Sequence, residues 1–219
     1  MIVNYVNLFY ECYIMIKCGR PPKGQESLSR DRLLDSALKL FLENGYGNLN
    51  METIARDAHV SMRTIYSHFG NKAGLFGAVI RRCSDQFVDG LTEHHEPQEA
   101  LLAFAKQFVS RITQPDVVRI RTILIGESLH FPELAAQFYE QGPQRTLDKL
   151  ARFFAKNQQA GYFCNMDPDV LADQFLSCLR NEHFHKLQLG LAPAPDEAEI
   201  DVWVRQAVEL FLHGCVADR

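Results

Sequence analysis

The chain has 219 residues, of which 47% are hydrophobic and 23% are charged. These proportions are close to the average for soluble globular proteins and exclude a disordered or collagen-like chain. The net charge is −4, yet the segment 19–72 carries 8 Lys and Arg against 6 Asp and Glu. A modest basic excess in one segment is typical of a protein that meets phosphates with one end only.

The first 18 residues, MIVNYVNLFYECYIMIKC, are mostly apolar and aromatic. They lack a basic leading segment, carry Asn4, Asn7 and Glu11, and are shorter than the roughly 20 apolar residues that a membrane span requires. We therefore expect neither a signal peptide nor a membrane partner. Our hypothesis is that translation starts naturally at Met15, with Met1 as the alternative.

The six cysteines are scattered, with no CxxC pair and no metal-like spacing to histidines. This pattern is typical of free thiols in a reducing compartment, which predicts a cytoplasmic protein with no metal and no other cofactor. A redox-sensing role for one thiol is left open. The cysteines are Cys12, Cys18, Cys83, Cys164, Cys178 and Cys215.

The N-terminal elements begin with a segment, 19–29, whose sequence GRPPKGQESLS is rich in Gly, Pro and Ser and predicts a flexible arm. A helical pattern starts at Arg30, where apolar residues recur every three or four positions as far as Phe41. Gly45 and Gly47 are expected to end this first helix.

Two short helices are predicted next. Asn50 is expected to cap a helix over 51–58, and after a two-residue turn Ser61 is expected to cap a helix that ends at Phe69. Two short helices joined in this way are typical of a helix-turn-helix. A longer helix, with its apolar positions over 75–87, follows them.

The rest of the chain keeps the helical periodicity, with no strand-like alternation and no hairpin signal. Five prolines each precede an apolar run, and proline is tolerated in the first turn of a helix. The chain is therefore predicted to be all-α, with about nine helices. The last five are expected over about 98–112, 115–129, 132–159, 168–189 and 195–214.

A family resemblance rests on four short runs: IA at 54–55, VS at 60–61, TIYSHF at 64–69 and NKAGLF at 71–76. Through these runs the segment Leu33–Ile80 resembles the DNA-binding domain of the TetR family of bacterial transcriptional regulators. The GRPP arm and the segment 121–175 also resemble one branch of that family, the AefR-like regulators.

The resemblance implies an N-terminal extension and arm over 1–27, a helix-turn-helix DNA-binding domain over 28–88 and a ligand-binding and dimerisation domain over 89–219. It implies a ligand-responsive regulator, expected to be a repressor, that binds a palindromic operator as a homodimer and is released by a small apolar or aromatic molecule. Activation, the inducer and the operator sequence are left open. The alternative is a small-molecule or metal-responsive helical protein whose helix-turn-helix is vestigial.

DNA contacts are expected on the second helix of the motif, which enters the major groove and presents its first side chains to base edges. Arg63 is the candidate for base readout, because its planar guanidinium can bond O6 and N7 of guanine together. Met62 and Ser67 are expected beside it. Arg20 and Lys23 on the arm are expected to reach a minor groove. The resemblance implies contacts to phosphate or sugar at Asn50, Thr64, Tyr66, His68 and Lys72, and Ser61 is also expected among the DNA-binding residues.

Tyr66 and His59 are the two residues of the motif whose roles are less direct. Tyr66 has a second interpretation, since aromatic residues at helical spacing usually pack in a core. His59 stands where the family usually has glycine, so a left-handed turn there would be strained at a cost of about 1 kcal/mol.

Apolar positions of the C-terminal helices carry two further expectations, each with ordinary packing within the chain as its alternative. A dimer interface is expected at Leu171, Leu179, Trp203, Ala207, Leu210 and Phe211. A ligand pocket is expected among Phe104, Phe108, Phe138, Tyr139, Phe154 and Phe175, with Arg121, Glu127 and His130 as its polar residues.

Enzyme activity is not expected, and no residue is assigned a catalytic role. The histidines at 94–95 and 183–185 lack the i, i+4 spacing of a helical zinc pair. The sequence also contains no GxSxG motif and no glycine-rich phosphate loop.

Overall fold

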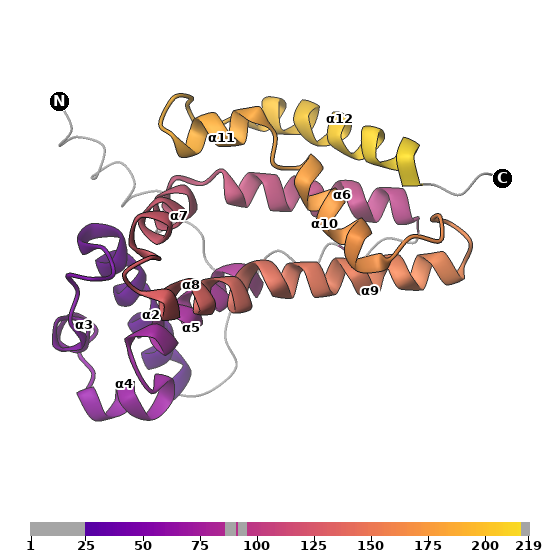
Figure 1. The fold of residues 1–219 in the computed structure, drawn as a ribbon. Coiled ribbons are helices and arrows are strands. Elements are labelled where there is room, and N and C mark those ends of the chain that lie inside the picture. The colour runs from indigo at the N-terminus through magenta and orange to yellow at the C-terminus, as the bar shows by residue number, and fades with distance from the viewer. Residues whose placement is uncertain (1–24, 86–90, 92–95, 216–219) are drawn as a thin grey trace.

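The computed structural model describes residues 25–85, 91 and 96–215 (Figure 1). The described residues form helices and no β-strand, so the predicted all-α fold is confirmed. The N-terminal helices are α2 (Gln25–Asn44), α3 (Met51–Asp57), α4 (Met62–Phe69) and α5 (Lys72–Asp85). The others are α6 (Pro97–Ile112), α7 (Pro115–Glu127), α8 (Pro132–Tyr139), α9 (Arg145–Gln159), α10 (Pro168–Cys178), α11 (Glu182–Gln188) and α12 (Glu197–Cys215).

Helices α2 to α5 form a small head with its own core. Leu33, Leu38 and Phe41 of α2 are buried against Ile54 of α3, Ile65 of α4 and apolar residues of α5. Apolar side chains at helical spacing drive this packing, since burying each one contributes about 1.5–3 kcal/mol. The head occupies one end of the molecule in Figure 1.

The core of the head continues onto two helices from beyond residue 88. Ile120 of α7 and Leu134 of α8 are buried in it, and Phe131 and Phe138 pack against it. A domain boundary at 88 therefore does not separate two cores. Helix α7 also packs against α6 and α11, and α8 leads into α9, so a shift of either helix acts directly on the head.

The second core joins α6, α9, α10, α11 and α12. Figure 1 shows α8 and α9 as one rod, with α6 and α12 side by side along it. Helix α10 lies between the pair α6 and α12 and the rod. Its centre is aromatic: the Phe154 ring lies 6.2 Å from that of Phe175 and 5.6 Å from that of Phe211, measured between centroids. These contacts are typical of edge-to-face and tilted packing in protein interiors.

Three predicted helices differ in detail from the observed ones. The first begins at Gln25 rather than Arg30, so residues 25–29 of the predicted flexible arm are helical. The helix expected over 132–159 is continuous, but it contains a π-helical segment, η2 (Glu140–Gln144), at Pro143. Proline lacks the N–H of a regular helical hydrogen bond, which favours such a local irregularity. The single helix expected over 168–189 is instead two, α10 and α11. Asn181 begins the second, because its side chain accepts a hydrogen bond from the Phe184 N–H at 3.1 Å.

The turn between α3 and α4 contains a backbone conformation that the sequence predicted as strained. His59 has a φ of 54°, the only positive value at a non-glycine residue among the described positions. A side chain with a Cβ is disfavoured in this left-handed region.

Replacing His59 by glycine is expected to raise the free energy of unfolding by about 1 kcal/mol, because glycine adopts positive φ without that strain. Urea unfolding measures the effect. His59→Ala is the matched control, since alanine removes the imidazole but keeps the Cβ. An equal gain from both variants would contradict backbone strain as the cause.

Within the ranges 25–85 and 96–215, no helix combines the length and the apolar character that crossing a membrane requires. The same residues contain no group of three His, Cys, Asp or Glu side chains arranged to hold a metal ion.

Candidate DNA-binding surface and its junction with the C-terminal domain

The helix-turn-helix is fixed by two side-chain caps. Asn50 Oδ1 accepts a hydrogen bond from the Thr53 N–H at 2.8 Å, and Ser61 Oγ accepts one from the Thr64 N–H at 3.0 Å. Each cap satisfies a backbone donor that the first turn of a helix leaves free. Asn50 and Ser61 are both exposed, at the helix ends where a phosphate would approach.

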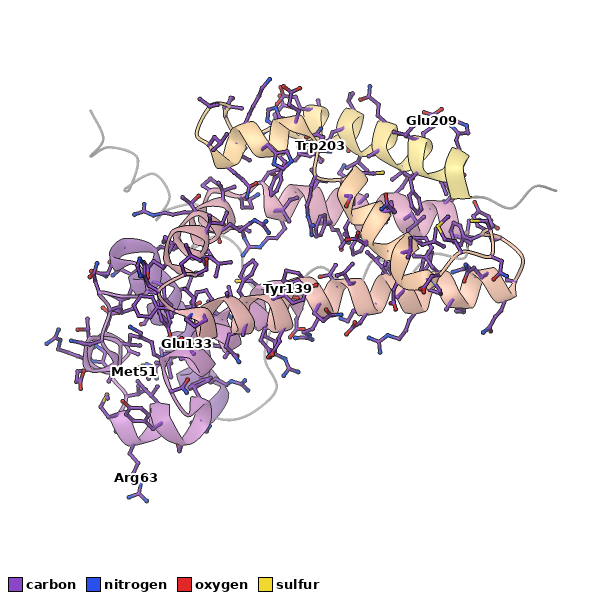
Figure 2. The ribbon with its side chains drawn as sticks, in the orientation of Figure 1. Met51, Arg63, Glu133, Tyr139, Trp203 and Glu209 are labelled. Carbon is purple, nitrogen blue, oxygen red and sulfur yellow. The ribbon has the colours of Figure 1, made fainter. Side chains whose placement is uncertain are left out.

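Helix α4 is strongly two-sided. Ile65 is fully buried in the core of the head, whereas Arg63, Ser67 and His68 are exposed. Arg63 projects away from the head at the lower end of the molecule (Figure 2). Tyr66 is 48% exposed, so its alternative interpretation as a core residue does not hold.

Two other predicted contacts on α4 are less accessible than expected. Met62 is half-buried and packs against the core of the head rather than lying outside with Arg63. The hydroxyl of Thr64 lies 2.8 Å from that of Ser61, in a hydrogen bond within the cap. Both side chains therefore help to build the motif, and the exposed reading face is narrower than predicted.

Lys72 has a different place from the phosphate contact that was predicted. Its Nζ donates hydrogen bonds to the backbone carbonyls of Tyr46 at 2.6 Å and Leu49 at 2.7 Å. It also lies 4.4 Å from the centroid of the Tyr46 ring. Burial lowers the pKa of Lys72, against the opposing charges of Glu127 and Glu133. The ammonium group is thus engaged in holding the loop between α2 and α3.

Glu127 was predicted in the ligand pocket and lies at the junction with the head instead. Its carboxylate accepts hydrogen bonds from the N–H groups of Tyr46, at 3.1 Å, and Gly47, at 2.6 Å. Gly45 has a φ of 77°, and a Cβ at this position would lie 2.6 Å from Glu127 Oε1. The close approach therefore requires glycine. We call Glu127, Lys72 and the loop 45–49 between them the interdomain clasp.

The clasp was not predicted because it joins residues about 80 positions apart. The Tyr46 hydroxyl lies in the same region. Burial is the main cause that raises its pKa to about 12, followed by the negative charges of Glu133 and Glu127. The clasp ties the last residue of α7 to the loop that leads into α3. It therefore links the C-terminal helices mechanically to the DNA-binding head.

The expected ligand residues do not form one site. Phe104, Phe154 and Phe175 are fully buried in the aromatic core, and His130 is exposed just after α7. Three of the remaining predicted residues lie around two arginines. Arg121 contacts the Phe138 ring, and Phe108 and Tyr139 lie by Arg180, which the sequence did not single out. Arg180 could have been selected from the sequence as a single arginine that follows the apolar run of α10.

The expected dimer residues mostly belong to the core of the chain itself. Five of them are buried within the single chain and leave little surface for a second subunit: Leu171, Leu179, Trp203, Ala207 and Phe211. Of the predicted set only Leu210 is exposed, at 70%. Arg20 and Lys23, the predicted minor-groove contacts, lie outside the described residues, as do the proposed start sites at Met1 and Met15.

A separate pocket of about 400 Å³ lies between α7 and the chain after α11. It is lined mainly by apolar side chains, among them Val118 and Leu187, with Arg119 and Thr122. None of the predicted ligand residues lines it.

Comparison with known proteins agrees with this architecture. Residues 33–79 match the family described as bacterial regulatory proteins of the tetR family. Residues 99–214, more than half of the chain, match the C-terminal domain of AefR-like transcriptional repressors. The chain belongs to the TetR family. It is a transcriptional regulator with a helix-turn-helix DNA-binding domain, and this family consists of regulators rather than enzymes.

Individual relatives agree over different lengths. The regulator YvkB of Bacillus subtilis is 25% identical over 202 residues, which cover 85% of this chain and 97% of YvkB. The biofilm operon negative regulator IcaR of Staphylococcus epidermidis is 25% identical over 83 residues, or 36% of this chain and 45% of IcaR. This second match therefore spans less than half of the relative. The structure of the flavonoid-responsive regulator FrrA is 32% identical, with a TM-score of 0.72 over 88% of this chain and 100% of FrrA.

Proposed function

We propose that this TetR-family chain is a homodimeric repressor that binds a palindromic operator and is released by a small aromatic or apolar effector. The observation that carries the proposal is the exposed face of α4, on which Arg63 projects from a helix fixed by its Ser61 cap and by buried Ile65. A dimer holds two such helices about one turn of B-DNA apart, roughly 34 Å, which suits a palindrome. The similarity to AefR-like repressors and to the negative regulator IcaR supports repression.

Release by an effector follows from linkage between two states. An effector that binds one arrangement of α7 more tightly than another lowers operator affinity by that difference alone. Helix α7 can transmit the change because it contributes Ile120 to the core of the head and Glu127 to the interdomain clasp. The similarity to flavonoid-responsive FrrA supports an aromatic effector.

A fluorescence-anisotropy titration with the DNA upstream of the gene tests operator binding. We expect tight binding to that DNA, weaker binding to a scrambled duplex, and a steep loss of affinity as salt rises, because phosphate contacts release counterions. Equal affinity for both duplexes at every salt concentration would indicate a helical binding protein with a vestigial helix-turn-helix. Absence of binding would indicate the same.

The dimer surface is proposed on the outer faces of α12 and α10. Val202 and Leu210 of α12 are 57% and 70% exposed, and they are eight residues apart, which places them on one side of a helix. Val170 of α10 is also exposed, and α10 packs against α12. In a symmetric dimer the same patch is used twice, once by each subunit.

The double variant Val202→Asp with Leu210→Asp is expected to weaken the dimer at least about 100-fold, because it removes buried apolar area twice and adds facing negative charges. Sedimentation velocity measures the change as a shift from dimer to monomer. The control is Leu189→Asp, on an equally exposed leucine just after α11. If this control dissociates the dimer and the double variant does not, the interface lies elsewhere.

A further inference from the structure

Two half-buried arginines of the C-terminal domain form no salt bridge within the described part of the chain. Arg121 lies on α7 and Arg180 lies in the turn between α10 and α11. Among the described residues, no carboxylate lies within salt-bridge distance of either guanidinium, and the Nε of Arg121 is buried with no hydrogen-bond partner. Arg111, whose Nε is also buried with no hydrogen-bond partner, differs in having a carboxylate beside it, because its NH1 lies 3.1 Å from the Asp116 carboxylate.

The two arginines are linked through Phe184, which lies four residues after Arg180 and has its ring centroid 5.6 Å from the Cζ of Arg121. Burial is the main cause that lowers the pKa of Arg121, and the positive charge of Arg180 is the second. Burial likewise lowers the pKa of Arg180, whereas Asp173 and Tyr139 act in the opposite direction. Two like charges partly withdrawn from water are unfavourable, and Asp173 acts on Arg180 while no acidic group acts on Arg121, so the charge of Arg121 is left without compensation.

Aromatic rings from three helices surround this pair. The Cζ of Arg121 lies 5.8 Å from the ring centroid of Phe138 in α8 and 5.6 Å from that of Phe184 in α11. The Cζ of Arg180 lies 5.8 Å from the ring centroid of Phe108 in α6. Ring faces attract a cation but do not neutralise it. The surroundings are thus suited to a planar apolar body carrying a negative group.

The side chains at this place are partly exposed to solvent. Tyr139, whose hydroxyl influences Arg180, is 51% exposed and lies on the rod formed by α8 and α9 (Figure 2). Arg121 and Arg180 are themselves only half-buried. The pair is thus more accessible than Phe154 and Phe175, which are fully buried.

We propose that Arg121 and Arg180 form the anion subsite of the effector site, so that the effector is an aromatic carboxylate. Its carboxylate lies between the two guanidinium groups, whose paired N–H donors match a carboxylate in geometry. Its ring packs beside Phe138, which is partly exposed, whereas Phe184 and Phe108 hold the two arginines from the buried side. This inference rests on the proposed function, because it names the class of molecule that would release the operator.

The position of Arg121 gives the bound anion a route to the DNA-binding head. Arg121 and Glu127 are six residues apart on α7, or about 9 Å along the helix axis. An anion that draws Arg121 toward Arg180 acts on the helix whose last residue holds the loop 45–49. The anion subsite and the interdomain clasp thus share one rigid element.

The test is isothermal titration of the full chain, without DNA, against 2-naphthoate and its neutral analogue 2-naphthamide. We expect 2-naphthoate to bind at least about tenfold more tightly, and we expect Arg121→Met with Arg180→Met to abolish that preference. Arg205→Met, on an exposed arginine of α12, is the matched control and should keep it. Equal affinity for the two probes, no binding of 2-naphthoate at millimolar concentration, or a preference that survives the double variant would overturn the proposal.

Thermal unfolding without any probe gives a second readout. The double Met variant should unfold at the same temperature as the parent or above it, because two unpaired charges are replaced by apolar side chains. Arg111→Met should unfold below it, because Asp116 loses its partner. A large loss of stability in the double variant, matching that of Arg111→Met, would show that the pair is a structural element and would overturn the subsite.

Operator titration with 2-naphthoate then separates the two proposals. Binding that depends on Arg121 and Arg180 but leaves operator affinity unchanged would support the subsite and contradict release by this effector. Release of the operator by 2-naphthamide alone would support effector control and overturn the anion subsite.

Discussion

Glu127→Ala is expected to lower the stability of the protein by about 2 kcal/mol and to uncouple operator binding from the effector. The carboxylate accepts two charge-assisted hydrogen bonds, from the N–H groups of Tyr46 and Gly47. Hydrogen bonds to charged groups contribute about 1.5–3 kcal/mol each when buried, and the exposure of Gly47 reduces the sum. Urea unfolding measures the stability, and faster hydrogen exchange at the amides of Tyr46 and Gly47 would locate the loss.

The uncoupling is a separate expected result for the same variant. If the clasp carries the motion of α7 to the loop 45–49, the alanine variant should still bind its effector but release the operator less completely. Glu133→Ala is the matched control, because it removes a carboxylate that also influences Lys72 and Tyr46 but accepts no hydrogen bond from the loop. Equal stability and equal release in the two variants would show that the clasp contributes nothing beyond local charge.

The local features of this fold could be predicted from the sequence. Asn50 and Ser61 were assigned as helix caps and both form the expected hydrogen bonds. His59 was assigned to a strained turn and has a positive φ. These features depend on residues within three or four positions of one another, so the chemistry that causes them is present in a short stretch of sequence.

Features that join distant segments could not be predicted in the same way. An apolar stripe at helical spacing has the same appearance whether it faces the chain's own core or a second subunit, so Trp203 and Phe211 were assigned to a dimer interface and are core residues instead. Glu127 was assigned to the ligand pocket as one of its polar residues. Its true partners lie in a loop that the sequence places far away.

Lys72 illustrates how a family position can be matched while its side chain takes another role. The residue occupies the start of α5, as predicted, yet its ammonium group is satisfied by carbonyls of the loop before α3. Only the fold brings that loop beside α5, because the two segments are more than 20 residues apart. The assignment of DNA contacts therefore narrows to the exposed side chains of α4 and to the helix caps.

Arg63→Ala is expected to weaken operator binding through the loss of a bidentate contact to one guanine in each half-site. The expected loss per half-site is about 1–3 kcal/mol, which is about 5- to 150-fold per half-site. Arg63 is the exposed arginine of α4, and its removal leaves the buried face and the Ser61 cap intact. The loss should therefore be confined to affinity, with no change in unfolding temperature. Fluorescence anisotropy against operators with single base-pair substitutions measures it.

The pattern of loss across that operator set decides what Arg63 contacts. If Arg63 reads a base, the variant becomes indifferent to substitution at one position of each half-site and keeps its preferences elsewhere, while the salt dependence changes little. If Arg63 contacts phosphate, affinity falls uniformly for every sequence and the salt slope decreases by about one. Arg205→Ala, on an exposed arginine of α12 far from the head, removes the same charge and should leave both the preferences and the slope unchanged. The charge-matched comparison therefore separates a specific contact from the general attraction of a basic protein to DNA.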